Sequence, residues 1–175
     1  LGKAQAGSKV ILIGASGGVG TFAVQVAKAM GCHVTAVCSS RNTALVNSLG
    51  ADAVIDYTQG DYRQNHGPFD LVYDITSFES PASAKHLMGK KGIFVSTMGS
   101  PQAAIKARLQ APRRAKVIQV ESYRQDLETL SHWVNTGKLK PVIDSEFDFK
   151  DTQKAYERSA TGRARGKIVI QVKNT

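Results

Sequence analysis

Residues 9–31, KVILIGASGGVGTFAVQVAKAMG, decide the fold class of this chain. Val10 to Ile13 form a short apolar run that ends at a glycine cluster, which is typical of a buried strand. Apolar residues then recur at intervals of three and four and predict a helix that ends at Gly31. The expected buried stripe of this helix consists of Val19, Phe22, Ala23, Val26, Ala27 and Met30. Strand, tight turn and helix are the first half of a βαβ unit.

The same alternation of short apolar runs and helical periods continues along most of the chain. Further strands are expected at residues 33–38, 53–55, 69–75, 92–98 and 116–120. Helices are expected at residues 43–49, 82–88 and 103–109. Leu127, Leu130 and Val134 mark the buried stripe of a further helix, which ends at Gly137. Such alternation requires parallel strands joined by right-handed crossovers. The sequence therefore predicts an α/β fold: a doubly wound, mostly parallel Rossmann sheet in three layers, α/β/α.

The last part of the chain breaks this rhythm. Residues 141–149 read as extended, Asp151 is a candidate N-cap for a helix that runs to Ala160, and residues 167–172 read as a final strand. We therefore expect residues 141–175 to form an extension of the main domain.

Length and composition point to one ordinary globular domain. The chain has 175 residues, of which 42% are hydrophobic and 21% charged, so neither disorder nor a fibrous repeat is expected. No uncharged apolar run approaches the ~18 residues that a membrane span needs. Cys32 and Cys38 match neither a disulfide framework nor a zinc spacing, which predicts no metal site and a reducing compartment, the cytoplasm.

The charge of the chain favours anionic partners. The formal net charge is +9, and there is no Asp or Glu from Leu1 to Ala51, although Lys3, Lys9, Lys28 and Arg41 lie there. A positive field of this kind attracts phosphate-bearing ligands. We expect the N-terminal third to face the anion.

The glycine-rich loop is the first candidate site. It follows the first strand and opens the first helix, which is the context in which such a motif binds a pyrophosphate. Gly17 allows backbone to approach the phosphates, and Gly20 allows the helix to pack against the strand. The predicted contacts are Ala15, Ser16, Gly17, Gly18 and Val19.

Three other classes of phosphate site fit the residues less well. A P-loop needs a Lys-Ser/Thr pair after its last glycine, but Thr21 and Phe22 follow here. Short-chain dehydrogenases need a Tyr with Lys four residues later, and no tyrosine of this chain has one. Methyltransferases that use S-adenosylmethionine need an acidic residue at the end of the second strand to bind the ribose hydroxyls, but this chain has Ser39 and Ser40 there.

That missing acid also bears on the choice between NAD and NADP. An NAD site usually holds the ribose hydroxyls with Asp or Glu about 20 residues beyond the glycines, whereas NADP sites use small polar residues and Arg. Here Ser39, Ser40 and Arg41 follow the second strand and can donate hydrogen bonds to a 2′-phosphate. The sequence predicts NADP(H), although Arg41 taken alone would also fit a solvated charge at a helix start.

Ser96, Thr97 and Met98 follow the fifth strand at the edge where doubly wound folds bind ligands. They are candidates to line the nicotinamide, and a plain strand-end loop is the alternative reading of the same residues.

Several linked segments resemble the cofactor domain of the medium-chain dehydrogenase/reductases, in the zinc-independent branch that is similar to quinone oxidoreductases. They are KVILIGASGGVGTFAVQVAKAMG, VTAVCSSRN, SLGADAVIDY, FDLVYDI, GKLKPVID and GRARGKIVI, in that order. The resemblance implies an NADPH-binding domain over residues 1–175 and hydride transfer to a quinone, an enone or a related carbonyl substrate. It also implies that Tyr57 lies near the adenosine phosphate.

The resemblance carries expectations about partners too. Family members have a GroES-like catalytic domain before the cofactor domain, and nothing precedes Leu1 here, so we expect that domain to be missing and residues 141–175 to contact it. No catalytic residue can be named in this chain. An apolar edge strand at residues 116–120 predicts a homodimer, as is frequent in the family.

Two functions of other classes remain open. One is a dinucleotide-sensing domain without chemistry. The other is a basic nucleic-acid-binding accessory protein, based on Arg113, Arg114 and Lys116; this cluster lacks interleaved aromatic residues and any nucleic-acid-binding motif, so nucleic acid is not the expected partner. No membrane partner is expected.

Overall fold

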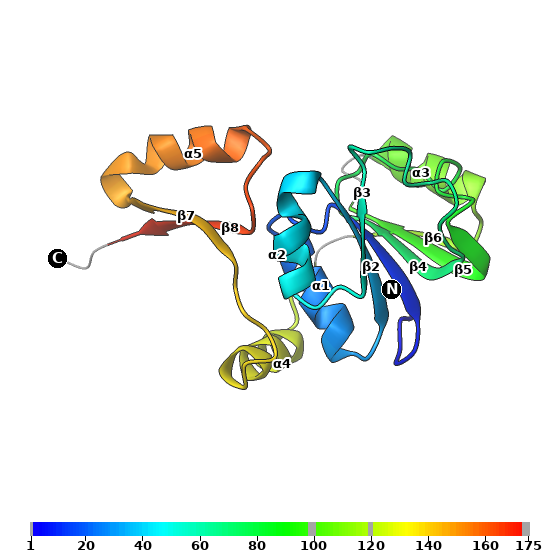
Figure 1. The fold of residues 1–175 in the computed structure, drawn as a ribbon, viewed down its shortest axis with the longest axis horizontal. Coiled ribbons are helices and arrows are strands. Elements are labelled where there is room, and N and C mark those ends of the chain that lie inside the picture. Colours follow the sequence, from blue (N-terminus) through cyan, green and yellow to red (C-terminus); the bar gives the residue numbers. More distant parts are fainter. Residues whose placement is uncertain (1, 98–100, 119–120, 173–175) are drawn as a thin grey trace.

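Six parallel strands form the main sheet of the computed structural model, which describes residues 2–97, 101–118 and 121–172 (Figure 1). The strands are β1 (Lys9–Ile13), β2 (His33–Cys38), β3 (Ala53–Asp56), β4 (Phe69–Asp74), β5 (Met88–Ser96) and β6 (Ala115–Val117). Their order is β3-β2-β1-β4-β5-β6, and every neighbouring pair is parallel. The predicted doubly wound Rossmann sheet is confirmed. Its order reverses between β1 and β4, where such folds leave a crevice at the carboxyl ends of the strands.

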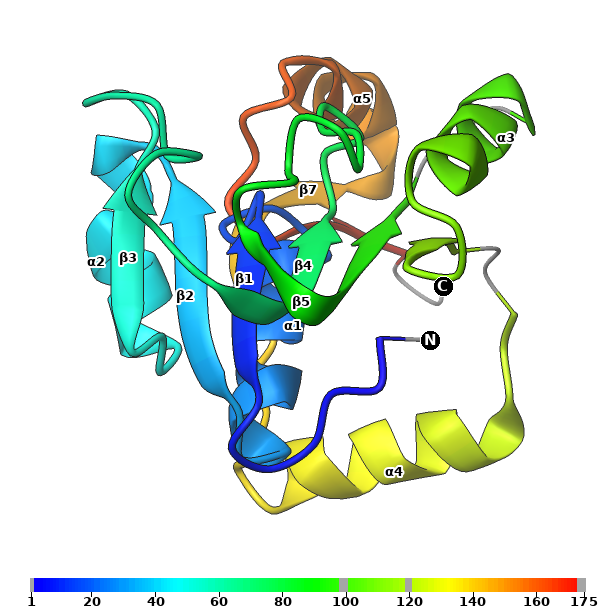
Figure 2. The same cartoon turned by 90° about the vertical axis from the view of Figure 1, so that its right-hand side faces the viewer.

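The helices are α1 (Gly20–Ala29), α2 (Thr43–Ser48), α3 (Pro101–Gln110), α4 (Arg124–Asn135) and α5 (Thr152–Ala160), with short 3-10 turns at Ser40–Asn42 and Phe149–Asp151. Figure 2 shows α1 and α2 behind the main sheet and α3 beyond its β5–β6 end. Within the described residues, none of these helices combines the length and the apolar character needed to cross a membrane.

The core has one apolar cluster on each face of the sheet, because successive strand residues point to opposite faces. Val10 and Leu12 of β1 pack with Val24 of α1 on one face. Ile11 and Ile13 pack with the other cluster, which includes Phe94, Ala84 and Leu87.

The helix expected at residues 82–88 is wrong. Residues 81–87 form consecutive turns, and Met88 already begins β5. Ser80 and Ser83 hydrogen-bond to each other's backbone or hydroxyl groups, which offers the chain an alternative to helical bonding. Ala84 and Leu87 are nevertheless fully buried, so this segment still covers the sheet face as expected.

The expected stripe of α1 is rotated. Val19 and Met30 are 48% and 42% exposed, whereas Val24, which lay outside the stripe, is fully buried. Gly20 fixes the rotation, since a Cβ on it would lie 2.6 Å from the Ala15 carbonyl carbon. Close contact at one glycine thus decided which side of an apolar helix is buried.

The buried stripe expected on α4 is also wrong. Leu127, Leu130 and Val134 are 59%, 37% and 40% exposed. Figure 2 shows α4 running below the sheet, at the end from which the strands start, where there is no sheet face to cover. Trp133 is half-buried, and its carbonyl oxygen accepts a hydrogen bond from the amide of Leu139, which is buried.

The sixth strand lies at one edge of the main sheet, as its predicted role in a dimer requires. It covers Ala115–Val117, and residues 119–120 of the expected strand lie outside the described residues. Association through this edge stays a prediction.

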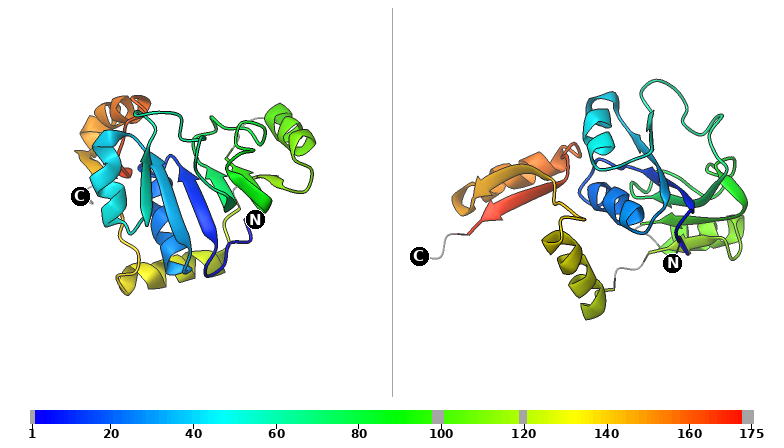
Figure 3. Two further views of the ribbon diagram at one scale, coloured as in Figure 1. Left: turned by 45° about the vertical axis from the view of Figure 1, so that its right-hand side comes forward. Right: turned by 60° about the horizontal axis from the view of Figure 1, so that its bottom comes forward.

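The C-terminal residues form a unit of their own. β7 (Ile143–Asp148) and β8 (Lys167–Gln171) pair in parallel as a separate two-stranded sheet, with α5 between them in the chain. Figure 3 shows this unit projecting from the main sheet. Gln25 of α1 holds the segment that leads to it, because its side chain donates to the Lys140 carbonyl (3.0 Å) and accepts from the Lys140 amide (2.7 Å). The contact of residues 141–175 with a further domain stays a prediction.

Candidate functional site

A cavity of about 510 Å³ opens at the carboxyl ends of the first four strands, at the point where the strand order reverses. Its walls are the glycine-rich loop, the segments that follow β2, β3 and β4, and the loop between α5 and β8. The lining residues are Ile13, Gly14, Ser16, Gly17, Val37, Cys38, Ser39, Arg41, Asn42, Tyr57, Gly60, Asp61, Tyr62, Arg63, Thr76, Phe78, Glu79, Gly162, Arg163 and Ala164.

The glycine-rich loop forms part of the cavity wall through Gly14, Ser16 and Gly17. Gly14 has a positive φ of 87°, and the amides of Gly14 and Ala15 both donate to the Val37 carbonyl, which ties the loop to β2. The amide of Gly17 donates to Gly14 at 3.3 Å, whereas those of Gly18 and Val19 make no backbone hydrogen bond within the described residues. No acid lies in the first turn of α1. Such a helix start suits the phosphates of a dinucleotide.

Asn42 links the glycine-rich loop to the segment after β2. It is 5% exposed, and its side-chain Nδ2 donates to the hydroxyl of Ser16 (2.8 Å) and to that of Ser39 (3.3 Å). Arg41 is exposed at the cavity wall and forms no ion pair within the described part of the chain. The cavity therefore has two hydroxyls and an uncompensated guanidinium on this side.

Asp56, at the end of β3, forms a hydrogen bond with the hydroxyl of Ser40. Its carboxylate accepts hydrogen bonds from the Ser40 hydroxyl and from the backbone and hydroxyl of Thr58. These bonds hold the pKa of Asp56 below its ordinary value, with Ser40 as the main cause. Neither Asp56 nor Ser40 lines the cavity.

Asp74, at the end of β4, builds the far wall. It is fully buried, and its carboxylate accepts from the amides of Thr76, Ser77 and Glu79. These three hydrogen bonds fix the backbone of the loop that follows β4. The loop thereby holds Thr76, Phe78 and Glu79 at the cavity.

A polar cluster closes the side near β3. Tyr62 donates its phenolic proton to Glu79, and Arg63 lies 2.7 Å from Asp61 and 3.7 Å from Glu79. Burial, followed by the hydrogen bond to Glu79, raises the pKa of Tyr62 far above its ordinary value. Both acids that line the cavity are thus paired with Arg63.

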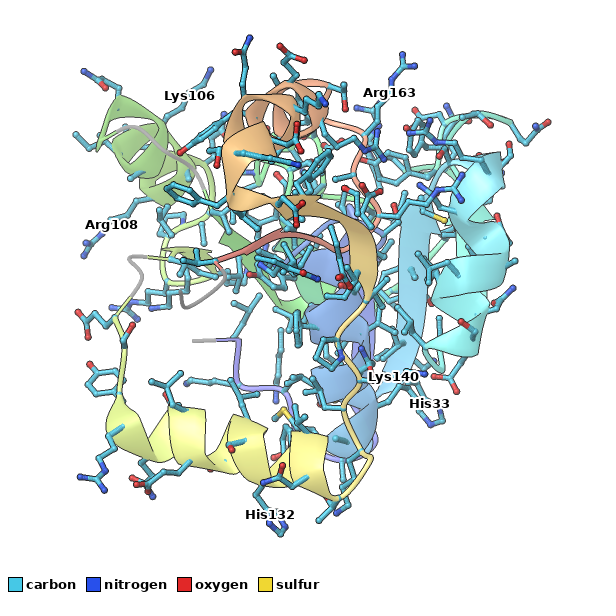
Figure 4. All side chains as sticks on the ribbon, turned by 90° about the vertical axis from the view of Figure 1, so that its left-hand side faces the viewer. His33, Lys106, Arg108, His132, Lys140 and Arg163 are labelled. Atoms are coloured by element: carbon cyan, nitrogen blue, oxygen red, sulfur yellow. The ribbon has the colours of Figure 1, made fainter. Side chains whose placement is uncertain are left out.

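The loop between α5 and β8 brings a second guanidinium. Arg163 lines the same cavity as Arg41, and Figure 4 shows its side chain at the end of the molecule opposite α4. The backbone holds this loop in place, because the Gly166 amide donates to the Ser16 carbonyl at 3.1 Å.

The structure brings five of the twelve predicted cofactor residues to the cavity: Ser16, Gly17, Ser39, Arg41 and Tyr57. Ala15 is fully buried, Gly18 lies under the Gly166 carbonyl, and Val19 stands outside the cavity wall. Ser96 is buried against Asp74, and Thr97 donates to the Ile75 carbonyl at 3.0 Å. Met98 lies outside the described residues. The contacts of these twelve residues with a cofactor stay predictions.

Sequence reasoning missed several residues of the cavity, chiefly Asn42, the 60–63 segment, Glu79 and Arg163. The rule that ligands bind beyond the carboxyl ends of strands would have found the segments after β3 and β4. Nothing in the sequence signals that the α5–β8 loop returns to the glycine-rich loop.

The basic cluster considered for nucleic acid is partly structural. Arg114 donates from Nη1 to the carbonyls of Gly89 (3.2 Å) and Lys90 (3.3 Å), which fastens the start of β5. Among the described residues, no three His, Cys, Asp or Glu side chains gather as a metal site would require. Cys32 and Cys38 are free and buried, and burial raises the pKa of both thiols.

Comparison with known sequences identifies relatives of this chain. Residues 49–170 match the family described as zinc-binding dehydrogenase. The chain is 38% identical to the trans-enoyl reductase pgmF of Aspergillus terreus over 99% of its own length and 54% of that protein. It is 35% identical to the chloroplastic quinone-oxidoreductase QR1 of Triphysaria versicolor, over 93% of its own length and 52% of that protein. The chain thus spans about half the length of these relatives.

Solved structures agree with the sequence comparison. The quinone oxidoreductase from Coxiella burnetii superposes with a TM-score of 0.87 at 29% identity, and the match covers 97% of this chain and 54% of that one. The fold described above is therefore shared with about half of this quinone oxidoreductase.

Proposed function

The chain belongs to the zinc-binding dehydrogenase family of medium-chain oxidoreductases, and from this we propose that it is the NADPH-binding domain of an enzyme that reduces a quinone, an enone or a related carbonyl compound. The nicotinamide supplies the hydride when bound. The residues of this chain would bind and orient the cofactor.

The observation that carries the proposal is the single cavity shared by the glycine-rich loop and the end of β2. A dinucleotide needs these two places at once: amides for the pyrophosphate, and a polar strand end for the adenosine ribose. Gly14, Ser16 and Gly17 of the loop line one part of the cavity, and Ser39, Arg41 and Tyr57 line another. The amides of Gly18 and Val19 make no backbone hydrogen bond within the described residues, and we propose that they bind the pyrophosphate.

The charges of the cavity support NADP(H) over NAD(H). Asp61 and Glu79 are the acids in its wall, and Arg63 pairs with both. Arg41 and Arg163 form no ion pair in the described residues, which leaves positive charge for a 2′-phosphate. Ser40 remains a proposed contact of that phosphate, but its hydroxyl would first have to leave Asp56.

The acceptor is proposed from the relatives. One is named a trans-enoyl reductase and another a quinone-oxidoreductase, and both are about twice as long as this chain. The β7–β8 unit and a further catalytic domain would form the rest of the substrate cleft. The cytoplasm stays part of this proposal, and cell fractionation tests it.

Replacing Arg41 tests the cofactor assignment. A hydrogen bond to a charged group contributes roughly 1.5 to 3 kcal/mol, so Arg41→Ala should weaken NADPH binding about ten- to a hundredfold and leave NADH binding nearly unchanged. Titration by nicotinamide fluorescence measures both.

Arg108→Ala is the matched control, because it removes the same charge from α3, which Figure 4 shows well away from Arg163. The assignment fails if Arg41→Ala weakens both cofactors alike, or if Arg108→Ala has the same effect.

A further inference from the structure

Asn42 is a buried amide whose two ends have different surroundings. Its Nδ2 donates to Ser16 and to Ser39, at 2.8 Å and 3.3 Å, while its Oδ1 is buried without a hydrogen-bond partner among the described residues. An unpartnered buried carbonyl costs stability, so its retention calls for a reason.

The two serines are the hydroxyls that line the cavity on either side of Asn42. Ser16 belongs to the glycine-rich loop, and Ser39 follows β2. Within the described residues, no other hydrogen bond involves either hydroxyl. Asn42 therefore determines whether the hydroxyls of Ser16 and Ser39 act as hydrogen-bond donors or acceptors toward a ligand.

A hydroxyl that accepts from an N–H keeps its own hydrogen available for donation. At neutral pH a phosphate group carries at most one hydrogen, so its oxygens need hydrogen-bond donors around them. By donating to both serines, the Nδ2 group leaves each hydroxyl with a hydrogen for a phosphate oxygen. An acceptor in the same place would take those hydrogens away.

On the basis of the function proposed above, we propose that Asn42 is a positioning residue that makes Ser16 and Ser39 hydrogen-bond donors toward the phosphates of NADPH. Ser16 would face the pyrophosphate, which NADH shares, and Ser39 the 2′-phosphate, which NADH lacks. The amide is also neutral, so it orders both hydroxyls without repelling the phosphates.

A carboxylate at position 42 reverses this arrangement with little change in volume. The carboxylate of Asn42→Asp would accept from both serines and add a negative charge beside the cavity. NADPH affinity should fall about a hundredfold and NADH affinity about tenfold, since one of the two reversed hydroxyls serves NADPH alone. Asn47→Asp is the control, because Asn47 is exposed on the neighbouring helix α2 and undergoes the same change of charge.

A double-mutant cycle separates positioning from a general loss of structure. Ser39→Ala and Asn42→Ala should each lower the ratio of NADPH to NADH affinity about tenfold, and the double variant should lower it no further than Ser39→Ala does. Circular dichroism and thermal unfolding show whether each variant is folded; if Asn42→Ala is not, the Asn42→Asp comparison decides.

The inference is overturned if Asn42→Asp keeps wild-type affinity for NADPH, or if the two alanine effects on the ratio multiply. Neither outcome touches the proposed function, which fails instead if the wild-type chain itself shows no preference for NADPH.

Discussion

Gly17 lies in the glycine-rich loop and Gly20, three residues later, begins α1, and the two glycines have different surroundings. A Cβ on Gly17 would come no closer than 3.6 Å to its nearest neighbour, the Gly14 carbonyl oxygen, whereas a Cβ on Gly20 would clash with that oxygen and with Ala15. Gly17 therefore keeps space open for a ligand, and Gly20 allows the chain to pack.

Alanine at each position should separate binding from stability. Gly17→Ala should leave the unfolding temperature nearly unchanged and weaken NADPH and NADH alike, about tenfold, because a methyl group occupies the approach to the pyrophosphate. Gly20→Ala should lower the free energy of unfolding by about 1–3 kcal/mol. Gly60→Ala, where nothing lies within 4 Å, is the control for the stability measurement alone, because Gly60 also lines the cavity. Equal stability of the Gly17 and Gly20 variants would contradict this account.

At the residue scale, the sequence was most informative where a side chain follows a strand. Ser39 and Arg41 come directly after β2, and both line the cavity. Asn42 escaped prediction because its importance depends on two partners that are 26 and three residues away. Arg163 escaped because the return of the α5–β8 loop is a tertiary contact.

At the scale of elements, periodicity predicted the strands better than the helix faces. All six strands of the main sheet coincide with apolar segments of the sequence, because runs of β-branched residues are favoured in a sheet that is buried on both faces. The stripe predicted for α4 was wrong, because α4 has no sheet face beside it. The stripe predicted for α1 was right in part: Ala27 is buried in the core, but Val19 and Met30 at the two ends of the helix are exposed. The helix propensity and periodicity of a sequence contain no information on either tertiary arrangement.

The β7–β8 unit contains an ion pair between a buried acid and a partly exposed arginine. Arg158 donates to both oxygens of Asp144, at 2.8 Å and 2.6 Å, and the Asp144 side chain is 5% exposed. The hydrogen bond from Arg158 is the main cause that holds the pKa of Asp144 far below its ordinary value. The ionised form is therefore strongly favoured in the folded unit.

Acid should loosen this unit. Because the folded pKa of Asp144 lies below the unfolded value of about 3.9, its stabilising effect is complete above that value and is lost as pH falls below it. Hydrogen exchange of β7 and β8 amides should accelerate, relative to the amides of β1, as pH falls from about 4 toward about 2. Asp144→Asn should remove most of this pH dependence, whereas Asp148→Asn on the same strand should not. An unchanged profile in Asp144→Asn would rule out this carboxylate as the cause.

At the scale of the whole molecule, the chain has a six-stranded Rossmann sheet and spans about half the length of its relatives. The cavity lies within this half, whereas no catalytic residue could be named in it. We expect the chain to fold and bind NADPH but to oxidise it only slowly with a simple quinone, at least a hundredfold below a full-length relative. Steady NADPH oxidation by this chain at the rate of a full-length relative would contradict the expectation that catalysis needs the further domain.

The most direct test of the central claim is the affinity of the wild-type chain for the two cofactors, titrated by nicotinamide fluorescence at several ionic strengths. The account predicts that NADPH binds about ten- to a hundredfold more tightly than NADH at low salt, and that the difference shrinks as salt screens the arginines. Equal affinities at every ionic strength would show that the end of β2 does not recognise a 2′-phosphate.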